Sequence, residues 1–302
     1  MCRIGIESVF TRLWFLMGLG VLLVACEKEE LSAPLTPTNP GSEVVPPEPE
    51  PEPVAPVVGR LELPERDSDL LFIEHKTLVG LDSVITYSLE YDFGLFHANW
   101  VAYRFDNTTR LKEVTRSQDA FKDDPLLPTE YRIGNGSFRN DGDYDRGHLC
   151  ASADRLYSLE ANQQTFYMSN MSPQLSGFNQ RYWKLLEEQV QQWGRDTQLA
   201  DTLYVCKGGC LSQSSLLGFV RNGMMAIPSH YYMALLAIKD GTYHSLGFWV
   251  AHENYPSSTR QEAVERHLVS VRELEENTGL NFFAALPAAV ADSVENERVI
   301  WP

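Results

Sequence analysis

The chain has 302 residues, of which 43% are hydrophobic and 22% are charged, and its formal net charge is −16 at pH 7. Because the first 58 residues read as a leader and a tether, about 240 residues remain, which suits one catalytic domain with a single sizeable core. The acidic balance excludes tight binding of a polyanion through the global charge, so such a substrate must meet a local cluster of cations.

The chain begins with a short apolar segment. Arg3 and Arg12 accompany an apolar run from Leu13 to Val24, which is short for a membrane span and typical of a signal peptide. The run ends in Leu23-Val24-Ala25-Cys26, which resembles a bacterial lipobox. We therefore expect residues 1–25 to be a lipoprotein signal peptide and Cys26 to carry the lipid that anchors the protein to a membrane. An ordinary secretory signal with an incidental cysteine is the alternative.

Residues 26–58 predict a solvated tether. Glu27-Lys28-Glu29-Glu30 resembles the acidic export tags of surface lipoproteins in some Gram-negative bacteria, and the proline and glutamate of residues 46–53 favour an extended, semi-rigid chain. The interpretation is an exported, membrane-anchored lipoprotein of a Gram-negative bacterium, on its outer membrane or cell surface. Residues 1–25 carry a charge of +1 and residues 26–58 carry −6, so −11 remains on residues 59–302.

Residues 59–302 have the pattern of a mixed α/β domain. Aromatic and β-branched residues predict strands at 83–89, 99–105, 203–206 and 230–238, whereas three glycines and two asparagines predict a loop over 134–143. Apolar residues at steps of three and four predict a helix over 179–193. Ser270 and Glu273 match a capping box and Gly279 a helix stop, which predicts a short helix over 271–278.

The most informative motif is Asp145-Arg146-Gly147-His148. An imidazole can accept a proton from water near neutral pH, and a guanidinium stays charged and matches phosphate oxygens in a fork. The glycine between them permits a tight backbone. This combination indicates phosphodiester chemistry, with His148 as the candidate general base and a pKa that can sit close to the working pH.

Further motifs follow at short spacings: Ser169-Asn170-Met171-Ser172-Pro173-Gln174, then Asn179, Trp183 and Glu187. Together with the core motif, they resemble the DNA/RNA non-specific endonuclease family, the sugar-non-specific ββα-metal nucleases. The resemblance covers roughly residues 75 to 300 and also includes Trp100-Val101-Ala102-Tyr103, Leu203-Tyr204-Val205, Ala226-Ile227-Pro228 and Thr278-Gly279-Leu280-Asn281-Phe282-Phe283.

The resemblance implies an α+β fold of the ββα-metal nuclease type, with a central mixed or antiparallel sheet flanked by helices, over residues 59–302. It also implies a Mg²⁺-dependent endonuclease, with Mn²⁺ as an alternative metal, that cuts DNA and RNA to products with a 5′-phosphate. Asn179 is the candidate metal ligand because an amide carbonyl is a hard oxygen donor. The alternative is a purely structural role for Asn179 as a helix N-cap. Glu187 lies too far along a straight helix to share that metal directly, so it is expected to orient a water or an arginine.

Two arginines are expected to contact the phosphate. Arg146 belongs to the core motif, but the upstream arginine departs from the pattern of the family, because Arg116 stands one residue early and a gapless match puts Ser117 in its place. Either a local bulge returns Arg116 to the site, which is the preferred interpretation, or the site relies on Arg146 and the metal.

The remaining cysteines and histidines give weaker signals. Cys206 and Cys210 flank Lys207-Gly208-Gly209, which could close a small disulfide loop, although Cys206 could equally be a buried strand residue. A zinc site is not expected, because the cysteine and histidine spacing falls short of one. The other histidines, including His230 and His252, are expected to be structural.

Two functions of different classes stay open. The first is the endonuclease, with DNA and RNA as partners and little base preference. The second is a surface lipoprotein that keeps the nuclease fold but only binds a partner. The joint presence of His148, Arg146, Asn179 and Glu187 favours the enzyme. The oligomeric state is left open.

Overall fold

The computed structural model describes residues 59–118 and 120–302. The predicted signal peptide, the lipid site at Cys26 and the tether lie outside the described residues. Within the described part of the chain, no helix is long and apolar enough to cross a membrane.

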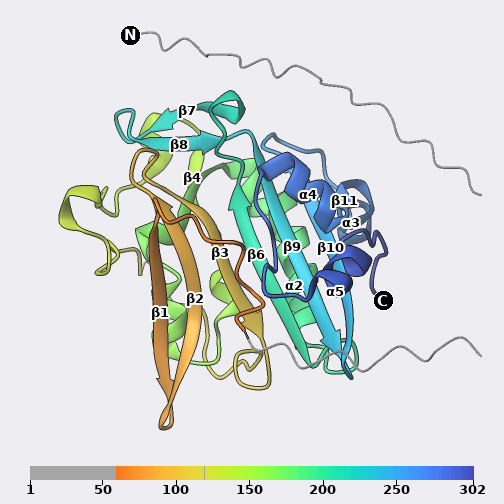
Figure 1. Ribbon diagram of the computed structural model, residues 1–302. Coiled ribbons are helices and arrows are strands. Elements are labelled where there is room, and N and C mark those ends of the chain that lie inside the picture. The colour runs from red at the N-terminus through yellow and green to blue at the C-terminus, as the bar shows by residue number, and fades with distance from the viewer. Residues whose placement is uncertain (1–58, 119) are drawn as a thin grey trace, which may run out of the picture. The chain divides into compact units, whose positions relative to one another are not determined.

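A seven-stranded sheet forms the centre of the fold, in the order β1-β2-β3-β6-β9-β10-β11, and every neighbouring pair is antiparallel (Figure 1). Its strands are β1 (Leu71–Val79), β2 (Asp82–Asp92), β3 (His97–Phe105), β6 (Thr202–Gly209), β9 (His230–Lys239), β10 (Thr242–Ala251) and β11 (Leu268–Val269). With helices packed on it, the sheet gives the α+β class expected from the sequence.

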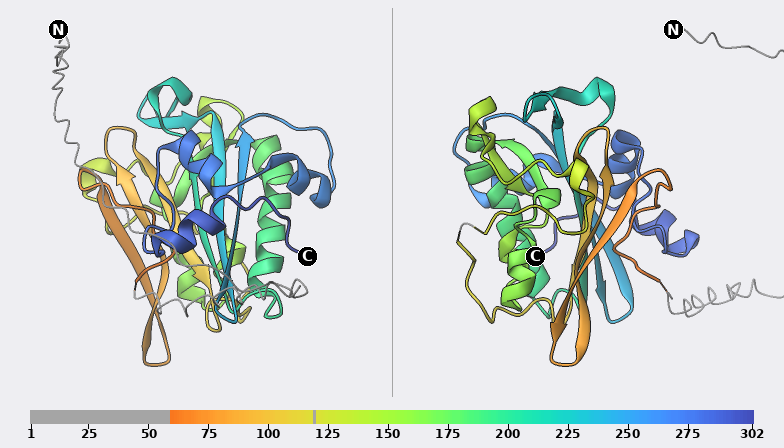
Figure 2. Two further views of the ribbon diagram at one scale, coloured as in Figure 1. Left: turned by 45° about the vertical axis from the view of Figure 1, so that its right-hand side comes forward. Right: turned by 90° about the vertical axis from the view of Figure 1, so that its left-hand side faces the viewer.

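The two faces of the sheet carry different helices. Because side chains alternate along a strand, Leu203 and Val205 of β6 join one apolar cluster and Cys206 joins another. The first cluster includes residues of α2 (Lys184–Arg195) and α3 (Arg260–His267), and the second includes residues of α4 (Val271–Thr278) and α5 (Ala288–Val294). The edge-on view in Figure 2 shows the sheet between these layers.

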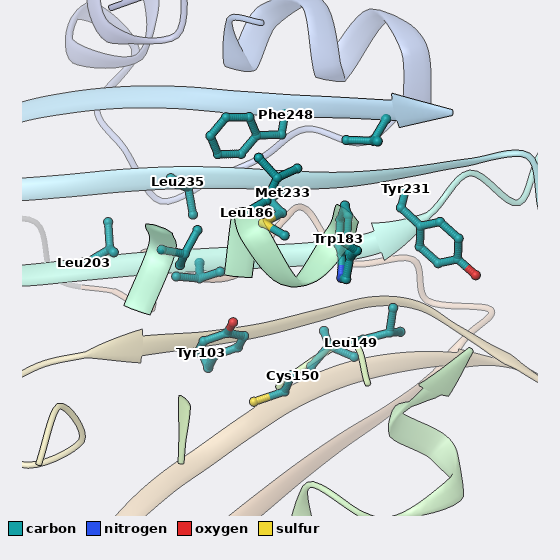
Figure 3. Close-up of a cluster of buried hydrophobic side chains, with 14 of the residues drawn as sticks. Tyr103, Leu149, Cys150, Trp183, Leu186, Leu203, Tyr231, Met233, Leu235 and Phe248 are labelled. Carbon is teal, nitrogen blue, oxygen red and sulfur yellow. The ribbon is translucent and has the colours of Figure 1, made fainter. Parts of the chain in front are cut away.

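Helix α2 packs against the sheet through an apolar stripe. Leu186, Val190 and Trp193 recur at steps of four and three and are fully or almost fully buried. They meet strand residues such as Met233 and Leu235 in the larger cluster, part of which Figure 3 shows. The opposite side of α2 is therefore left to face solvent and the cleft described below.

Two two-stranded sheets and a short helix complete the fold. Strand β4 (Tyr144–His148) pairs with β5 (Met171–Leu175), and β7 (Leu216–Val220) pairs with β8 (Met225–Pro228). Helix α1 (Leu159–Gln164) lies in the connection between β4 and β5 and begins at the side-chain cap of Ser158, whose oxygen accepts from the backbone of Ala161.

Most predicted elements are confirmed. The four predicted strands lie within β2, β3, β6 and β9, and α4 has the predicted bounds, with a complete Ser270–Glu273 capping box and Gly279 in the left-handed conformation at φ 74°. The loop over 134–143 contains one 3₁₀ turn at Phe138–Asp141. The pattern missed β1 and β10, whose side chains were not recognised as strand-forming.

The predicted helix over 179–193 is partly wrong. The segment Phe178–Trp183 is π-helical, and regular α-helix begins only at Lys184. A π-helical turn is wider than an α-helical turn and often marks a functional position, because it displaces side chains from the regular helical face. Asn179 lies inside this turn, so its alternative interpretation as an N-cap is also wrong.

Candidate active site

Strand β4 carries the central motif, and its glycine is required by close packing. Gly147 lies opposite Ser172 of β5, and a Cβ atom built on it would lie only 2.1 Å from Oε1 of Gln174. The backbone here is an ordinary strand with no positive φ at Gly147. The glycine expected to permit a tight backbone is needed here for a different reason, because the Gln174 side chain fills the space that a larger residue would occupy.

The end of β4 is held by Asn170. Its Oδ1 accepts from the backbone N–H of Cys150 at 2.8 Å, and its Nδ2 donates to the carbonyls of Cys150 and Thr165 at 2.9 and 2.7 Å. Asn170 is fully buried, so these bonds are shielded from water. They fix the backbone immediately after His148 and thereby the direction of its side chain.

His148 is neutral in the free protein. Its ring packs against Phe166 at 4.9 Å and Phe121 at 5.8 Å between ring centroids, and its Nε2 is buried without a hydrogen-bond partner among the described residues. Burial, with smaller contributions from the charges of Arg116 and Arg146, lowers the pKa of His148 to about 3. The expectation of a pKa near the working pH is therefore not met in the free protein.

Both predicted arginines lie beside His148. The guanidinium of Arg146 lies 3.6 Å from the centroid of the Phe121 ring, and one of its nitrogens donates to the carbonyl of Asn135. Arg116 donates from Nε to Oγ of Ser152 at 2.8 Å. These contacts hold two cations on the same side of the motif.

The local backbone shows which of Arg116 and Ser117 reaches the cleft. Arg116 lines the cleft, whereas the backbone N–H of Ser117 donates to Oδ1 of Asn162 at 2.8 Å and the Ser117 hydroxyl is buried without a partner in the described chain. Asn162 in turn donates to the carbonyl of Ser152 at 2.7 Å, the residue that Arg116 contacts. The geometry thus favours Arg116 over Ser117 at the site.

Asn179 is oriented by Asp145. The Nδ2 atom of Asn179 donates to Oδ2 of Asp145 at 3.1 Å, so its Oδ1 is left without a protein donor within the described residues. Asp145 also accepts from Arg139, Ser176 and Gln180. Burial alone would raise the pKa of Asp145, but these donors more than offset it and lower the pKa, so the carboxylate stays ionised.

The candidate residues line one cleft. The cavity has a volume of about 660 Å³, and its walls include all five predicted site residues, Arg116, Arg146, His148, Asn179 and Glu187. They come from the segment before β4, from β4 itself, from the π-helical turn and from α2. Residues up to 71 positions apart in the sequence, from 116 to 187, thus meet in one place.

Glu187 forms the inner part of the cleft wall. Its side chain is 14% exposed, and its Oε1 lies 3.5 Å from Nζ of the fully buried Lys207 on β6. Burial raises the pKa of Glu187 to about 7, although the charge of Lys207 acts in the opposite direction. Burial thus favours the protonated carboxyl of Glu187, and Lys207 favours the ionised one.

A hard cation fits the donor set at Asn179. Within the described residues, no three His, Cys, Asp or Glu side chains gather as a potential metal site. The candidate position instead offers one amide oxygen fixed by Asp145, beside an open cleft with room for substrate oxygens and water. Magnesium prefers oxygen ligands and keeps several waters, so one protein ligand of this kind is chemically suitable.

Two features of the site were missed by sequence reasoning. The orienting role of Asp145 follows from contacts to residues 31 and 34 positions away, although its place in the motif was a signal. Lys207 was interpreted as part of a flexible loop, but it is a buried residue of a central strand. Cys206 and Cys210 are free thiols, so the disulfide alternative is not what the structure shows and Cys206 is a buried strand residue.

Comparison with known proteins identifies the kind of domain that carries this cleft. A family model described as DNA/RNA non-specific endonuclease matches residues 71–289. The chain is 29% identical over 240 residues to "Nuclease EXOG, mitochondrial" of Danio rerio, covering 76% of this chain and 65% of that protein. It is 29% identical over 215 residues to "Endonuclease G, mitochondrial" of Homo sapiens, covering 68% and 70%. It is 30% identical over 181 residues to "Nuclease C1" of Cunninghamella echinulata var. echinulata, covering 57% and 69%.

A solved structure has the same fold. In a crystal structure of the EndoG/EndoGI complex, described as showing the mechanism of EndoG inhibition, the matched chain superimposes with a TM-score of 0.62 at 23% sequence identity. The match covers 76% of this chain and 93% of that one. The ββα-metal nuclease fold expected from the sequence is confirmed.

Proposed function

The chain belongs to the DNA/RNA non-specific endonuclease family, and we propose that it is a metal-dependent endonuclease that hydrolyses phosphodiester bonds of DNA and RNA. The observation that carries this proposal is the meeting of His148, Arg116, Arg146, Asn179 and Glu187 in one cleft. These side chains supply a base, two phosphate-binding cations, an oxygen ligand for a hard metal ion and a carboxylate.

His148 acts as the general base. Because Nε2 is buried, Nδ1 is the ring nitrogen that can accept a proton from a water in the cleft. The low pKa of His148 in the free protein ensures that its ring is neutral, but it also makes the ring a weak base. A bound phosphate would offset the charges of Arg116 and Arg146, so the pKa of His148 rises when substrate binds and the base strengthens where it is needed.

The two arginines bind and polarise the phosphate. A guanidinium presents parallel N–H donors that match two phosphate oxygens, and its charge-assisted bonds strengthen as negative charge develops in the transition state. Phe121 lies beneath Arg146 and Phe166 lies near Arg116, with their ring centroids 3.6 and 5.1 Å from the guanidinium carbons. The rings restrict how far either cation can move, so both are oriented before substrate arrives.

Asn179 would hold the metal ion through Oδ1, and Mg²⁺, or Mn²⁺ in its place, would supply charge neutralisation at the phosphate and at the departing oxygen. Asp145 fixes the amide so that its oxygen is the atom offered to the cleft. Glu187 sits farther along the same wall, where its carboxylate can accept a hydrogen bond from a water or an arginine in the cleft.

The substrate preference follows from these contacts. The cations of the cleft are suited to phosphate oxygens, which are common to DNA and RNA and carry no base identity. The net charge of −16 means that attraction is confined to this cleft, so binding is weak and sensitive to salt. We expect both nucleic acids to be cut with little sequence preference.

The activity is tested by incubating the purified protein with plasmid DNA and with RNA, with Mg²⁺, with Mn²⁺ and with a chelator. We expect both substrates to be digested only when a divalent metal is present, and the products to carry a 5′-phosphate. Digestion of neither substrate with any divalent metal would show that the nuclease interpretation is wrong.

We also propose that the protein is exported and anchored through lipid on Cys26, on the strength of the lipobox-like Leu23-Val24-Ala25-Cys26. Expression in a Gram-negative host with a radiolabelled fatty acid tests this. We expect label on the parent and none on Cys26→Ser, whereas equal labelling would contradict the anchor.

A further inference from the structure

A lysine is buried beneath the floor of the cleft. Lys207 lies in the middle of the sheet on β6, between Val101 of β3 and Met233 of β9, and its side chain is 0% exposed. Its Nζ lies 3.5 Å from Oδ2 of Asp154, which is also fully buried, and 3.5 Å from Oε1 of Glu187. Tyr103 donates to the same Asp154 oxygen at 2.5 Å.

The fold alone does not require a charge at this position. Burying an ammonium costs free energy that a carboxylate only partly offsets, and replacing a buried ion pair by apolar residues is often neutral or stabilising. The strand neighbours Val205, Val101 and Met233 are apolar members of the core, so the sheet packing around position 207 supplies no partner for an ammonium. The lysine therefore calls for an explanation outside core packing.

Of its two acidic partners, only Glu187 reaches the cleft. Asp154 is fully buried, while Glu187 lines the cavity and is 14% exposed. The other titratable groups around Glu187 are Lys184 and Glu188 on its own helix, the neutral His148 with Arg116 and Arg146 on the same cleft, and Arg195 behind Asp154. In the described chain, the ion pair of Glu187 is the one with Lys207.

We propose that Lys207 is a positioning residue of the active site, which holds the Glu187 carboxylate against the cleft wall and favours its ionised form. Asp154 weakens the effect of Lys207 on Glu187, because the Lys207 ammonium interacts with both carboxylates. The part played by Glu187 in turnover rests on the proposed nuclease function, whereas the coupling of the three side chains does not.

The direction of each effect follows from the charges. Burial raises the pKa of Glu187, Lys207 lowers it and Asp154 raises it. Removing the Lys207 charge therefore favours the protonated carboxyl and moves its titration to higher pH. Removing the Asp154 charge has the opposite effect, because the ammonium then faces Glu187 alone. An opposite charge within about 4–6 Å changes a pKa by about one to three units.

The decisive measurement is the titration of Glu187 itself, by carbon NMR of the full chain labelled at the glutamate carboxyl carbon and assigned with Glu187→Gln. We expect Lys207→Met to move the midpoint upward and Asp154→Asn to move it downward, each by about one unit or more. Lys207→Arg keeps the charge and should titrate nearer to the parent than Lys207→Met does. Lys239→Met is the matched control, because Lys239 pairs with Asp201 at the surface and should leave Glu187 unchanged.

Turnover gives a second readout. If Glu187 must be ionised for turnover, the acidic limb of the profile of kcat against pH should follow the NMR midpoint in each variant. It should move to higher pH in Lys207→Met and to lower pH in Asp154→Asn, with little change in KM for nucleic acid. Both shifts should disappear in the Glu187→Gln background.

The outcomes separate the two proposals. Identical Glu187 midpoints in the parent and Lys207→Met, or shifts of the same sign in Lys207→Met and Asp154→Asn, would overturn the positioning role. The expected opposite shifts without any nuclease activity in the parent would support the coupling and contradict the nuclease function. If Lys207→Met does not fold, Asp154→Asn decides by its sign, because a downward shift requires the shared ammonium.

Discussion

Cys206 and Lys207 are neighbours on β6 and both are fully buried, yet they lie in opposite surroundings. Cys206 faces the apolar cluster beneath α4 and α5, which includes Leu274 and Val294. Lys207 faces Asp154 and Glu187 beneath the cleft. The apolar cluster stabilises through burial of surface, whereas the charged cluster contributes little net stability and instead fixes groups at the site. Variants in the apolar cluster should therefore lower stability without changing turnover, whereas variants of the residues that line the cleft should mainly change turnover.

The largest expected effect lies at the base. His148→Ala should lower kcat by about 10²–10⁴-fold, the usual contribution of general base catalysis, with the fold intact. The initial rate of plasmid cleavage measures the fall in kcat, and thermal unfolding checks that the variant is folded. His244→Ala is the matched control, because His244 is 53% exposed and pairs with Glu297 at the surface. Cleavage by His148→Ala at the parent rate would place the base elsewhere.

The apolar cluster should show the reverse pattern. Leu274→Ala removes a fully buried side chain that fills the space beside Gly247, so it should lower the free energy of unfolding by about 2–5 kcal/mol. Denaturant unfolding measures this loss. Below the unfolding transition, kcat should remain at the parent value. A large fall in kcat of the folded variant would show that the two regions are not independent.

Arg116 tests the shifted register. Arg116→Ala should lower kcat by about 10²–10³-fold with little change in KM, because its bond to phosphate strengthens in the transition state. Arg116→Lys should recover little, since an ammonium lacks the planar fork. Ser117→Ala, which removes a buried hydroxyl without a partner in the described chain, should cut normally. Loss of activity in Ser117→Ala together with normal cleavage by Arg116→Ala would reverse the assignment.

The smallest of these effects concerns the metal. Asp145→Asn should weaken the hold on the Asn179 amide and raise the Mg²⁺ concentration for half-maximal rate by about 10–100-fold, the usual cost of losing a group that orients a metal ligand. Asn179→Ala should raise it at least as far, and Asn296→Ala, at the surface, should not raise it. An unchanged Mg²⁺ requirement in Asn179→Ala would mean that this residue does not hold the metal.

Local patterns could be predicted wherever neighbouring residues decide the structure. The capping box of Ser270 and Glu273 and the left-handed Gly279 define α4 because every contact involved spans a few residues. The apolar stripe of α2 was recognisable for the same reason. The π-helical turn at 178–183 was not, because an apolar repeat cannot reveal one wider turn before a regular helix.

The sequence by itself determined the family and indicated a candidate base, candidate cations and a candidate metal ligand, since these depend on residue types at short spacings around His148, Arg146 and Asn179. Only the tertiary structure decided that Arg116 rather than Ser117 reaches the cleft, that Asp145 orients Asn179 and that Lys207 pairs with Glu187. The physical reason is that each of these depends on side chains brought within a few ångströms by folding. Coulomb and hydrogen-bond energies act over such distances and are independent of separation along the chain.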